Sequence, residues 1–520
     1  MLTASLTLTQ VRAVEFHDFE IGVYYARPDA NETCGWDWSL MNMARAGCTV
    51  IVCSSAYQQG NQFWAAAKAW NIKGIRAYNI LNSAPPDYVI DEPALTDWIL
   101  ADKAIWDNMS WQGVSLKDNM IGYMICDEPE CYPGLTEPQK DWLHAFCDLA
   151  AVLDPNRDTY VNHCDVPWYD LHEAKATSSS PVIFLNRSKL DRRMDEALAK
   201  GLDGLICVAQ SNRIRDWVDQ YPERVTHAEL GAGSEEAVDF LASRTNYQDL
   251  YEYVQAAFYC GTKGCIVYSF NPSGGSLSYS LIDNQGNDNN YRLEALKDSA
   301  HDIRAAQDWP IITTFGQQLS PSQITPLRDR RRYPAGSITL AATATSPTGA
   351  SLRLIFGMST DGGATWTNRT DYSAPFVTDP PFTLTAGDKV IFRALAIDMA
   401  AQKRSIYAAN MIYVINPAQL QCEDYHSQQI PGDIDHNCRV DIKDLAEFVL
   451  AWLDCDDPDS FENQCGSWDE FNQFYCGQKA SGYPSISADL DDDCNVDMID
   501  LAILAADWLT CDDPQTANCP

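Results

Sequence analysis

Hydrophobic and polar positions alternate in two different ways along this chain, and the change falls near residue 310. From about residue 20 to 304, short apolar runs alternate with longer amphipathic stretches, a pattern typical of βα units around a parallel sheet. A (β/α)8 TIM barrel needs eight strands, so one of the runs 182–188 and 203–210 is expected to lie outside the barrel. In either case residues 225–233 are predicted as the penultimate strand and residues 264–272 as the last. The nine runs are 21–27, 49–55, 73–80, 121–129, 159–164, 182–188, 203–210, 225–233 and 264–272.

Residues 311–417 are rich in Thr, Ser and Pro and contain alternating apolar runs without a helical stripe. This pattern predicts an all-β, immunoglobulin-like sandwich. Its segment STDGGATW (359–366) matches the Asp-box pattern S-x-D-x-G-x-T-W, which usually marks a hairpin turn in propellers. One copy cannot build a propeller, so a hairpin turn within the sandwich is expected. The sandwich either binds carbohydrate or spaces the barrel from the tail.

The tail contains two related stretches, 433–453 and 489–509, offset by 56 residues. In each copy, oxygen-bearing side chains occupy positions 1, 3, 5, 9 and 12 of a predicted loop, a spacing that can wrap a hard cation such as Ca²⁺. An apolar stripe at helical spacing follows each loop. The first copy supplies Asp433, Asp435, Asn437, Asp441 and Asp444, and the second supplies Asp489, Asp491, Asp493, Asp497 and Asp500.

Charge and cysteine content separate the tail from the rest of the chain. The formal net charge is −35, and residues 421–520 hold 23 acidic residues against three basic ones. Nucleic-acid binding by charge is therefore disfavoured. Eight of the 18 cysteines also lie in this acidic region, which indicates disulfides and an oxidising compartment. A zinc site is not expected, because CxxC pairs are absent. Cys48, Cys53, Cys126, Cys207 and Cys265 lie in apolar runs and are interpreted mostly as small buried hydrophobic residues.

The first 13 residues lack a basic start and are short for a complete signal peptide. They are either the clipped end of one, with Val11 and Ala13 at the −3 and −1 cleavage positions, or an ordinary disordered start. No apolar run reaches the length of a transmembrane helix. The expected protein is secreted or at the cell surface. Its predicted parts are residues 1–13 as the possible signal remnant, 14–310 as the catalytic barrel, 311–417 as the sandwich and 420–520 as a calcium module.

Two glutamates mark the expected catalytic end of the barrel. Chemistry in such barrels lies at the carboxyl ends of the strands. Glu128 follows the fourth predicted strand in the motif CDEPE, and Glu229 ends the predicted seventh strand in AELGAG. Such a pair suits glycoside hydrolysis, in which one carboxylic acid protonates the leaving oxygen and the other attacks the anomeric carbon. Either residue alone would be read as a helix-start or surface-loop acid.

Residues 20–304 thus resemble clan A of the glycoside hydrolases, the retaining (β/α)8 enzymes. The resemblance implies Glu128 as acid/base and Glu229 as nucleophile, with no cofactor for catalysis. Asp127 stands where the clan has an Asn, so it cannot donate a hydrogen bond when ionised, although its charge would raise the pKa of Glu128. The usual Trp of the last strand is absent. The expected substrate contacts are Asp127, Asn162, His163 and Tyr268, with Trp36, Trp38 and Trp168 either stacking on sugar rings or packing within the protein.

The tail resembles a type I dockerin, the paired calcium-loop module that docks polysaccharide-degrading enzymes onto cohesins. The resemblance implies two structural Ca²⁺ ions and a cohesin-like or cell-surface partner. Three features depart from the family. Cys438 and Cys494 replace the glycine at position 6, the insert between repeats is long, and positions 10 and 11 are Ile442–Lys443 and Met498–Ile499 rather than a small hydroxyl pair. Calcium binding therefore carries over better than the cohesin partner.

The dockerin resemblance also bears on the disulfides. Pairing within a repeat is implausible, because a helix of about 12 residues is roughly 18 Å long and a disulfide needs Cα atoms within about 7 Å. If the two units pack antiparallel, as in dockerins, the pairs Cys438–Cys511 and Cys455–Cys494 are favoured. Rival partners remain at Cys422, Cys465, Cys476 and Cys519.

Two functions remain open from the sequence. The first is a secreted retaining glycoside hydrolase acting on a polysaccharide or oligosaccharide. The second is a non-catalytic carbohydrate-binding or surface-attachment protein with a degenerate barrel. Glu128 and Glu229 at the ends of two barrel strands favour the first.

Overall fold

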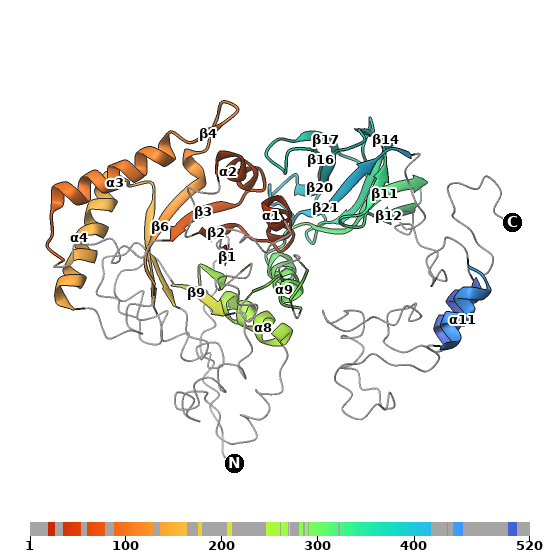
Figure 1. Ribbon diagram of the computed structural model, residues 1–520, viewed down its shortest axis with the longest axis horizontal. Coiled ribbons are helices and arrows are strands. Elements are labelled where there is room, and N and C mark those ends of the chain that lie inside the picture. The colour runs from red at the N-terminus through yellow and green to blue at the C-terminus, as the bar shows by residue number, and fades with distance from the viewer. Residues whose placement is uncertain are drawn as a thin grey trace, which may run out of the picture.

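The computed structural model describes the residues 19–25, 35–53, 60–77, 88–127, 136–163, 175–178, 205–210, 246–259, 262–268, 270, 280–283, 287–289, 291–320, 323–417, 434, 440–450 and 498–506. In strand segments 126–127, 161–163, 175–178 and 205–210, the backbone alone is described. The fold has a barrel, a two-sheet β domain and a pair of tail helices (Figure 1).

Eight parallel strands close the barrel in the order β1-β10-β9-β8-β7-β6-β3-β2. Each is paired on both sides, which satisfies the backbone polar groups. The strands are β1 (Glu20–Tyr24), β2 (Val50–Cys53), β3 (Lys73–Ala77), β6 (Met120–Asp127), β7 (Asp158–His163), β8 (Lys175–Ser178), β9 (Leu205–Gln210) and β10 (Gly264–Tyr268).

The described helices pack outside the barrel (Figure 1). Helix α4 starts with a capping box between Thr136 and Gln139, and Asp91 caps α3 by accepting from the N–H of Ala94. A short hairpin and one 3₁₀ turn join α3 to β6. The elements are α1 (Trp36–Arg45), α2 (Gly60–Ala69), α3 (Glu92–Asp107), β4 (Ser110–Trp111), β5 (Val114–Ser115), η3 (Lys117–Asn119), α4 (Glu137–Leu153), α8 (Asn246–Tyr259) and α9 (Arg292–Ala306).

Strand order corrects part of the prediction. Residues 203–210 do supply a barrel strand, β9, but the sixth strand is β8 at Lys175–Ser178. Strand β9 pairs directly with β10, with Cys207 opposite Cys265, so β9 is the penultimate strand and the prediction for 225–233 is wrong. The reason is that β8 reads KATS, which has no apolar run. The runs 182–188 and 225–233 lie outside the described residues.

The second domain contains two main sheets that share one core. Buried Leu340, Phe356 and Phe392 come from both sheets, which is the layering of a β-sandwich; the immunoglobulin-like assignment remains a prediction. One sheet contains β12 (Gln323–Pro326), β11 (Ile311–Ser320), β15 (Leu340–Thr345) and β18 (Phe376–Val377). The other contains β13 (Arg332–Pro334), β21 (Ala408–Ile415), β20 (Lys389–Asp398), β16 (Leu352–Ser359) and β17 (Thr367–Asp371), and β14 (Gly336–Ile338) pairs with β19 (Phe382–Leu384).

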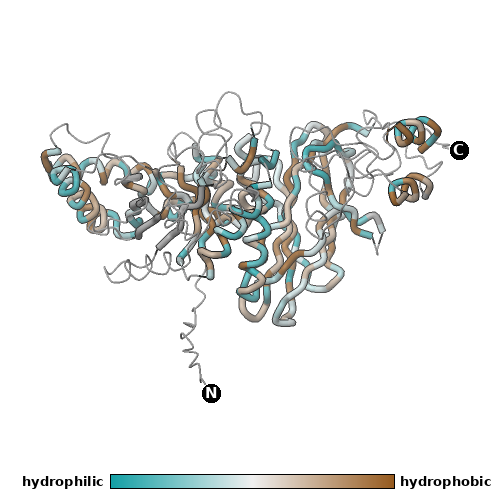
Figure 2. Tube along the Cα trace, turned by 90° about the horizontal axis from the view of Figure 1, so that it is seen from below, coloured by the Kyte–Doolittle hydropathy of each residue, from teal (hydrophilic) through white to brown (hydrophobic). Residues whose placement is uncertain are grey.

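Two short helices represent the tail, α11 (Ile442–Leu450) and α12 (Met498–Ala506), and they lie beside each other (Figure 2). Each begins inside one of the sequence repeats. In each, a buried aspartate is followed four residues later by a buried apolar residue, Asp444 with Phe448 and Asp500 with Leu504. Val449 belongs to the apolar stripe that was expected to follow the first calcium loop at helical spacing, but it is 62% exposed. No described helix is long and apolar enough to cross a membrane.

Candidate functional site at the carboxyl end of the barrel

The carboxyl ends of the fourth and fifth strands bring the predicted polar residues to one level. Asp127 is the last residue of β6, and its register partner is Asn162 on β7. Asn162 in turn is level with Thr177 on β8, and His163 is level with Ser178. Glu128 follows Asp127 directly in the chain and lies, like Glu229 and Trp168, outside the described residues. The described backbone therefore gathers Asp127, Asn162 and His163 at the end of the barrel where such folds carry their chemistry.

The barrel interior is filled by apolar side chains below this level. Val50, Ile75, Tyr160 and Ile266 inside the barrel are each at most 3% exposed. Tyr24 and Tyr268 belong to the same interior cluster but are only partly buried. They are the last residues of β1 and β10, at the carboxyl end of the barrel.

The rings of Tyr24 and Tyr268 contact each other at the carboxyl end of the barrel. Their ring centroids are 5.3 Å apart at an interplanar angle of 66°, an edge-to-face contact. The Tyr24 hydroxyl reaches across the interior and donates to the sulfur of Met124 at 2.7 Å. Tyr268 was expected from the sequence at this position. Tyr24 was missed, because the predicted run 21–27 continues past it, whereas strand β1 ends at Tyr24.

The end of the seventh barrel strand carries no acid in the described backbone. Strand β9 ends at Gln210, whose register partner is Tyr268. The expectation that Glu229 ends the seventh strand is therefore corrected. It followed from assigning residues 225–233 to that strand.

Trp36 and Trp38 pack against other parts of the protein. Trp38 is 8% exposed, and the guanidinium of Arg330 lies over its ring at 3.8 Å from the centroid. Trp36 is partly buried and meets Phe63 edge-on with centroids 6.0 Å apart. Of the two roles left open by the sequence, stacking on sugar rings or packing within the protein, the contact with Arg330 favours packing for Trp38. The structure gives both side chains a packing role.

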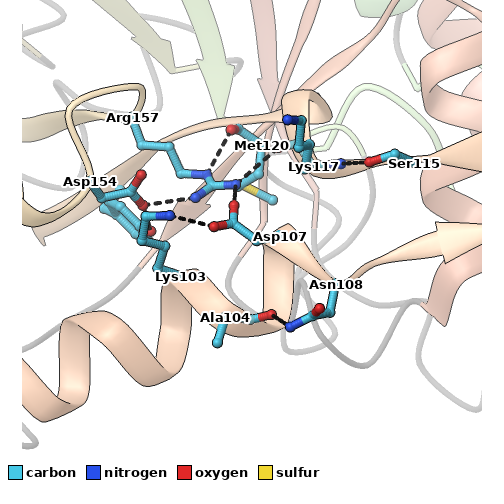
Figure 3. Close-up of polar contacts among 10 residues, drawn as sticks. Lys103, Ala104, Asp107, Asn108, Ser115, Lys117, Met120, Asp154 and Arg157 are labelled. Carbon is cyan, nitrogen blue, oxygen red and sulfur yellow. Dashed lines mark hydrogen bonds and ion pairs between the residues drawn. The ribbon is translucent and has the colours of Figure 1, made fainter.

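The most connected polar cluster in the described residues lies at the opposite, amino end of the barrel strands (Figure 3). Arg157, just before β7, donates to Asp154 at 2.8 Å, to Asp107 at 3.1 Å and to the carbonyl of Met120 at 3.1 Å. Tyr123 donates to Asp154 at 2.6 Å, and burial together with this bond raises the pKa of Tyr123. The cluster ties α3 and α4 to the start of β6 and β7, which is a structural role.

Two carboxyl groups with raised pKa values also serve packing. Burial raises the pKa of Asp102 on α3 to about 7, while a hydrogen bond with Trp106 and the charge of Arg157 oppose that shift. Asp102 also forms an ion pair with Arg76 on β3. Burial raises the pKa of Asp288 to about 6, while both of its oxygens accept backbone N–H groups of Leu293 and Glu294 at the start of α9. Asp102 links α3 to the outer face of the barrel, and Asp288 caps the amino end of α9.

Of the ten predicted calcium ligands, the structure describes three, namely Asp441, Asp444 and Asp500. Asp444 and Asp500 are each 0% exposed, and an oxygen of Asp444 accepts the N–H of Asp441 at 2.7 Å. These two fully buried carboxylates occupy the equivalent position 12 of the two predicted calcium loops. Within the described residues, no group of three or more His, Cys, Asp or Glu is placed to hold a metal.

Four described cysteines are buried and form no disulfide, namely Cys48, Cys53, Cys147 and Cys265. Burial raises the pKa of Cys48 far above its usual value. The prediction of small buried hydrophobic residues is confirmed for Cys48, Cys53 and Cys265. Side chains of the remaining cysteines, including the four in the predicted crossed disulfides, lie outside the described residues.

Comparison with known proteins assigns no family. No protein-family model and no curated protein matches the sequence. Solved structures with some likeness include a Parabacteroides merdae β-glucuronidase (9% identity, 76% of this chain and 48% of that chain, TM-score 0.35). They also include the endo-β-1,4-mannanase of Thermotoga petrophila (11% identity, 78% and 99%, TM-score 0.37) and GH5_18 from Streptomyces cattleya with GlcNAc (11% identity, 61% and 83%, TM-score 0.38). The chain spans about half the length of the β-glucuronidase. With TM-scores below 0.5, these likenesses carry no weight, and function is inferred from the residues of this chain.

Proposed function

We propose that this protein is a secreted glycoside hydrolase that cleaves O-glycosidic bonds of a polysaccharide or oligosaccharide, with Glu128 as the acid/base. The observation that carries the proposal is the position of Asp127 as the last residue of the fourth strand in a closed eight-stranded parallel barrel. Glu128 is the next residue in the chain. Asn162 is level with Asp127 on the neighbouring strand.

The proposed chemistry assigns a distinct task to each group. Glu128 protonates the leaving oxygen, and the negative charge of the adjacent Asp127 raises the pKa of Glu128, which suits a proton donor. Asn162 and His163 bind sugar hydroxyls, and the partly exposed rings of Tyr24 and Tyr268 contact the apolar face of a sugar.

Glu229 is proposed as the nucleophile of a retaining mechanism. This role rests on its motif AELGAG, because β9 and not residues 225–233 supplies the seventh strand. Retention requires the two carboxyl groups to lie roughly 5–5.5 Å apart, whereas inversion needs more than about 6.5 Å.

The full-length protein should first be tested on a panel of plant and algal polysaccharides. On any substrate that is cleaved, Glu128→Gln should lower turnover by about 10²–10⁴-fold. It should spare aryl glycosides with good leaving groups, because these need no proton, whereas Glu229→Gln should abolish turnover on both. Glu137→Gln is the control, since this exposed glutamate at the start of α4 is outside the site. Equal losses on both substrate types in Glu128→Gln would contradict the acid/base role.

A non-catalytic carbohydrate-binding protein is the second candidate. It is favoured by Gln210, an uncharged residue, at the end of the seventh barrel strand. In this case polysaccharides from the same panel should bind saturably without being cleaved. Binding should weaken in Tyr268→Ala and remain unchanged in Glu128→Gln.

The tail is proposed to bind two structural Ca²⁺ ions and to attach the enzyme to a cohesin-like or cell-surface protein. Support comes from the repeated ligand spacing and from the buried Asp444 and Asp500. Oxygen ligands of this kind supply the coordination that Ca²⁺ prefers.

A further inference from the structure

The β-sandwich shares a continuous apolar interface with the barrel. Ile391, Ile406, Ala409 and Met411 of the sandwich belong to the same buried cluster as the residues of α1, α2 and α9. Figure 1 shows these helices on the side of the barrel that faces the sandwich. A Cβ at Gly47, after α1, would lie 2.8 Å from Ala300 on α9 and 3.1 Å from Ile406. The packing is therefore as close as in a single core.

The Asp-box segment forms a rigid turn at this interface. Asp361 accepts from the N–H and the hydroxyl of Thr365 at 2.9 and 2.7 Å, and Ser359 accepts from the N–H of Gly363 at 2.9 Å. Gly362 and Gly363 have φ values of 76° and 92°, which favour glycine. A Cβ on them would lie within 3 Å of Trp36 and Trp70, respectively. The turn thus places bare backbone against two tryptophans of the barrel, and Gln62 on α2 donates to the carbonyl of Asp361 at 2.9 Å.

Arg393 of β20 crosses the same interface. Its guanidinium lies 3.8 Å from the ring centroid of Trp366, 5.3 Å from that of Trp70 and 5.4 Å from that of Tyr407. It donates to the carbonyl of Ala69 at 2.6 Å. Ala69 is the last residue of α2, where the helix dipole favours a cation. Within the described part of the chain no carboxylate pairs with Arg393, and burial lowers its pKa to about 10.

Three further contacts hold α1 along its length. Lys389 pairs with Asp37 in the first turn, and Asp329 pairs with Arg45 in the last. Between them, Arg330 covers Trp38. These charges also suit the dipole of α1, since the acid is at its amino end and the base at its carboxyl end.

We propose that the sandwich is rigidly packed against the barrel and that the two domains unfold as one cooperative unit. The contacts made by the turn 359–366 and by Arg393 couple the two domains. Arg393 is a partly buried cation that contacts aromatic rings from both domains and the end of α2, and it loses partners if either domain opens. The sandwich is consequently no mobile binding module on a flexible linker. This inference does not depend on the proposed glycosidase activity.

The test is hydrogen exchange by mass spectrometry on the full-length chain at increasing urea concentrations. In the wild type, peptides from α2 and β2 should lose protection at the same urea concentration as peptides from β16 and β20. Arg393→Met, which keeps an apolar side chain but removes the cation, should increase the opening equilibrium constant of both sets at least tenfold. Arg393→Lys should behave similarly, because lysine lacks the planar group that stacks on the rings.

Arg369→Met is the matched control. Like Arg393, Arg369 is partly buried and lies over an aromatic ring, Phe382, but this contact lies entirely within the sandwich. It should leave the α2 and β2 peptides unchanged within about twofold. If Arg393→Met does not fold, Gln62→Ala removes only the hydrogen bond to Asp361 and should weaken both sets together by a smaller factor. Separate wild-type transitions for barrel and sandwich would overturn the proposal, as would barrel peptides unaffected by either interface variant.

Discussion

Asp154 and Arg157 form a buried ion pair at the amino end of the barrel, with side chains 1% and 4% exposed. Replacing Arg157 by Met would leave Asp154 buried without its cation and would remove bonds to Asp107 and to two backbone carbonyls. Breaking such a pair from one side costs about 3–5 kcal/mol. We expect Arg157→Met to lower the free energy of unfolding by that amount, measured by urea denaturation.

The chain offers a matched control with the same spacing. Lys140 and Glu137 are also three residues apart, but the Glu137 side chain is 78% exposed. Because exposed pairs contribute roughly 0–1 kcal/mol, Lys140→Met should change stability little. Similar losses in the two variants would show that burial is not the reason for the large effect.

The hydrogen bonds to Asp398, at the end of β20, should make the stability of the sandwich sensitive to acid. The N–H of Ala401 lowers the pKa of Asp398, and the N–H of Ala400 and the hydroxyls of Thr348 and Ser346 act in the same direction. A lowered folded pKa means that this stabilisation is present above the unfolded value of about 3.9 and is lost as pH falls through the folded value. Asp398→Asn should therefore lose less stability than the wild type between pH 7 and pH 3, measured as urea midpoints. Equal losses would contradict this.

Helices α11 and α12 should depend on calcium. Each carries a fully buried aspartate in its first turn, Asp444 or Asp500. A ligand at 100 times its Kd stabilises the domain that binds it by about 2.7 kcal/mol and leaves other domains unchanged. Excess chelator should therefore abolish hydrogen-exchange protection in both helices and leave the protection of the barrel peptides unchanged. Calorimetry should give two Ca²⁺ ions per chain.

The controls for calcium lie on the same helices. Asp444→Asn with Asp500→Asn should remove the response to calcium. Glu447→Gln should keep it, because Glu447 is an exposed residue of α11 outside the ligand pattern. Full protection of both helices in chelator would refute a structural role for calcium.

At the level of the strands, apolar runs located seven of the eight barrel strands. The exception is β8, whose four residues KATS carry no hydrophobic signal. Its place is fixed by backbone pairing to β7 and β9. A strand inside a closed barrel gains its hydrogen bonds from both neighbours whatever its side chains are, so local sequence could not reveal it.

For the whole molecule, acidity should control self-association. The formal net charge is −35 at pH 7, and the sequence pI is about 4.4. Charge repulsion keeps molecules apart when net charge is far from zero. Light scattering should therefore show association rising as pH approaches 4.4 at low salt. Constant scattering between pH 7 and pH 4.4 would contradict a dominant role of net charge.

The sequence by itself determined the βα alternation, the all-β character of residues 311–417 and the repeat in the tail, because hydrophobic period and ligand spacing are local properties. It also placed Asp127 at the end of the fourth strand. Only the tertiary structure decided which segment is the seventh strand, and hence that Gln210 ends it. It also decided that Trp38 faces Arg330 and that Arg393 enters a cage of rings from both domains. These facts depend on contacts between residues far apart in the chain, such as Arg393 and Ala69 at a separation of 324, and no local pattern encodes them.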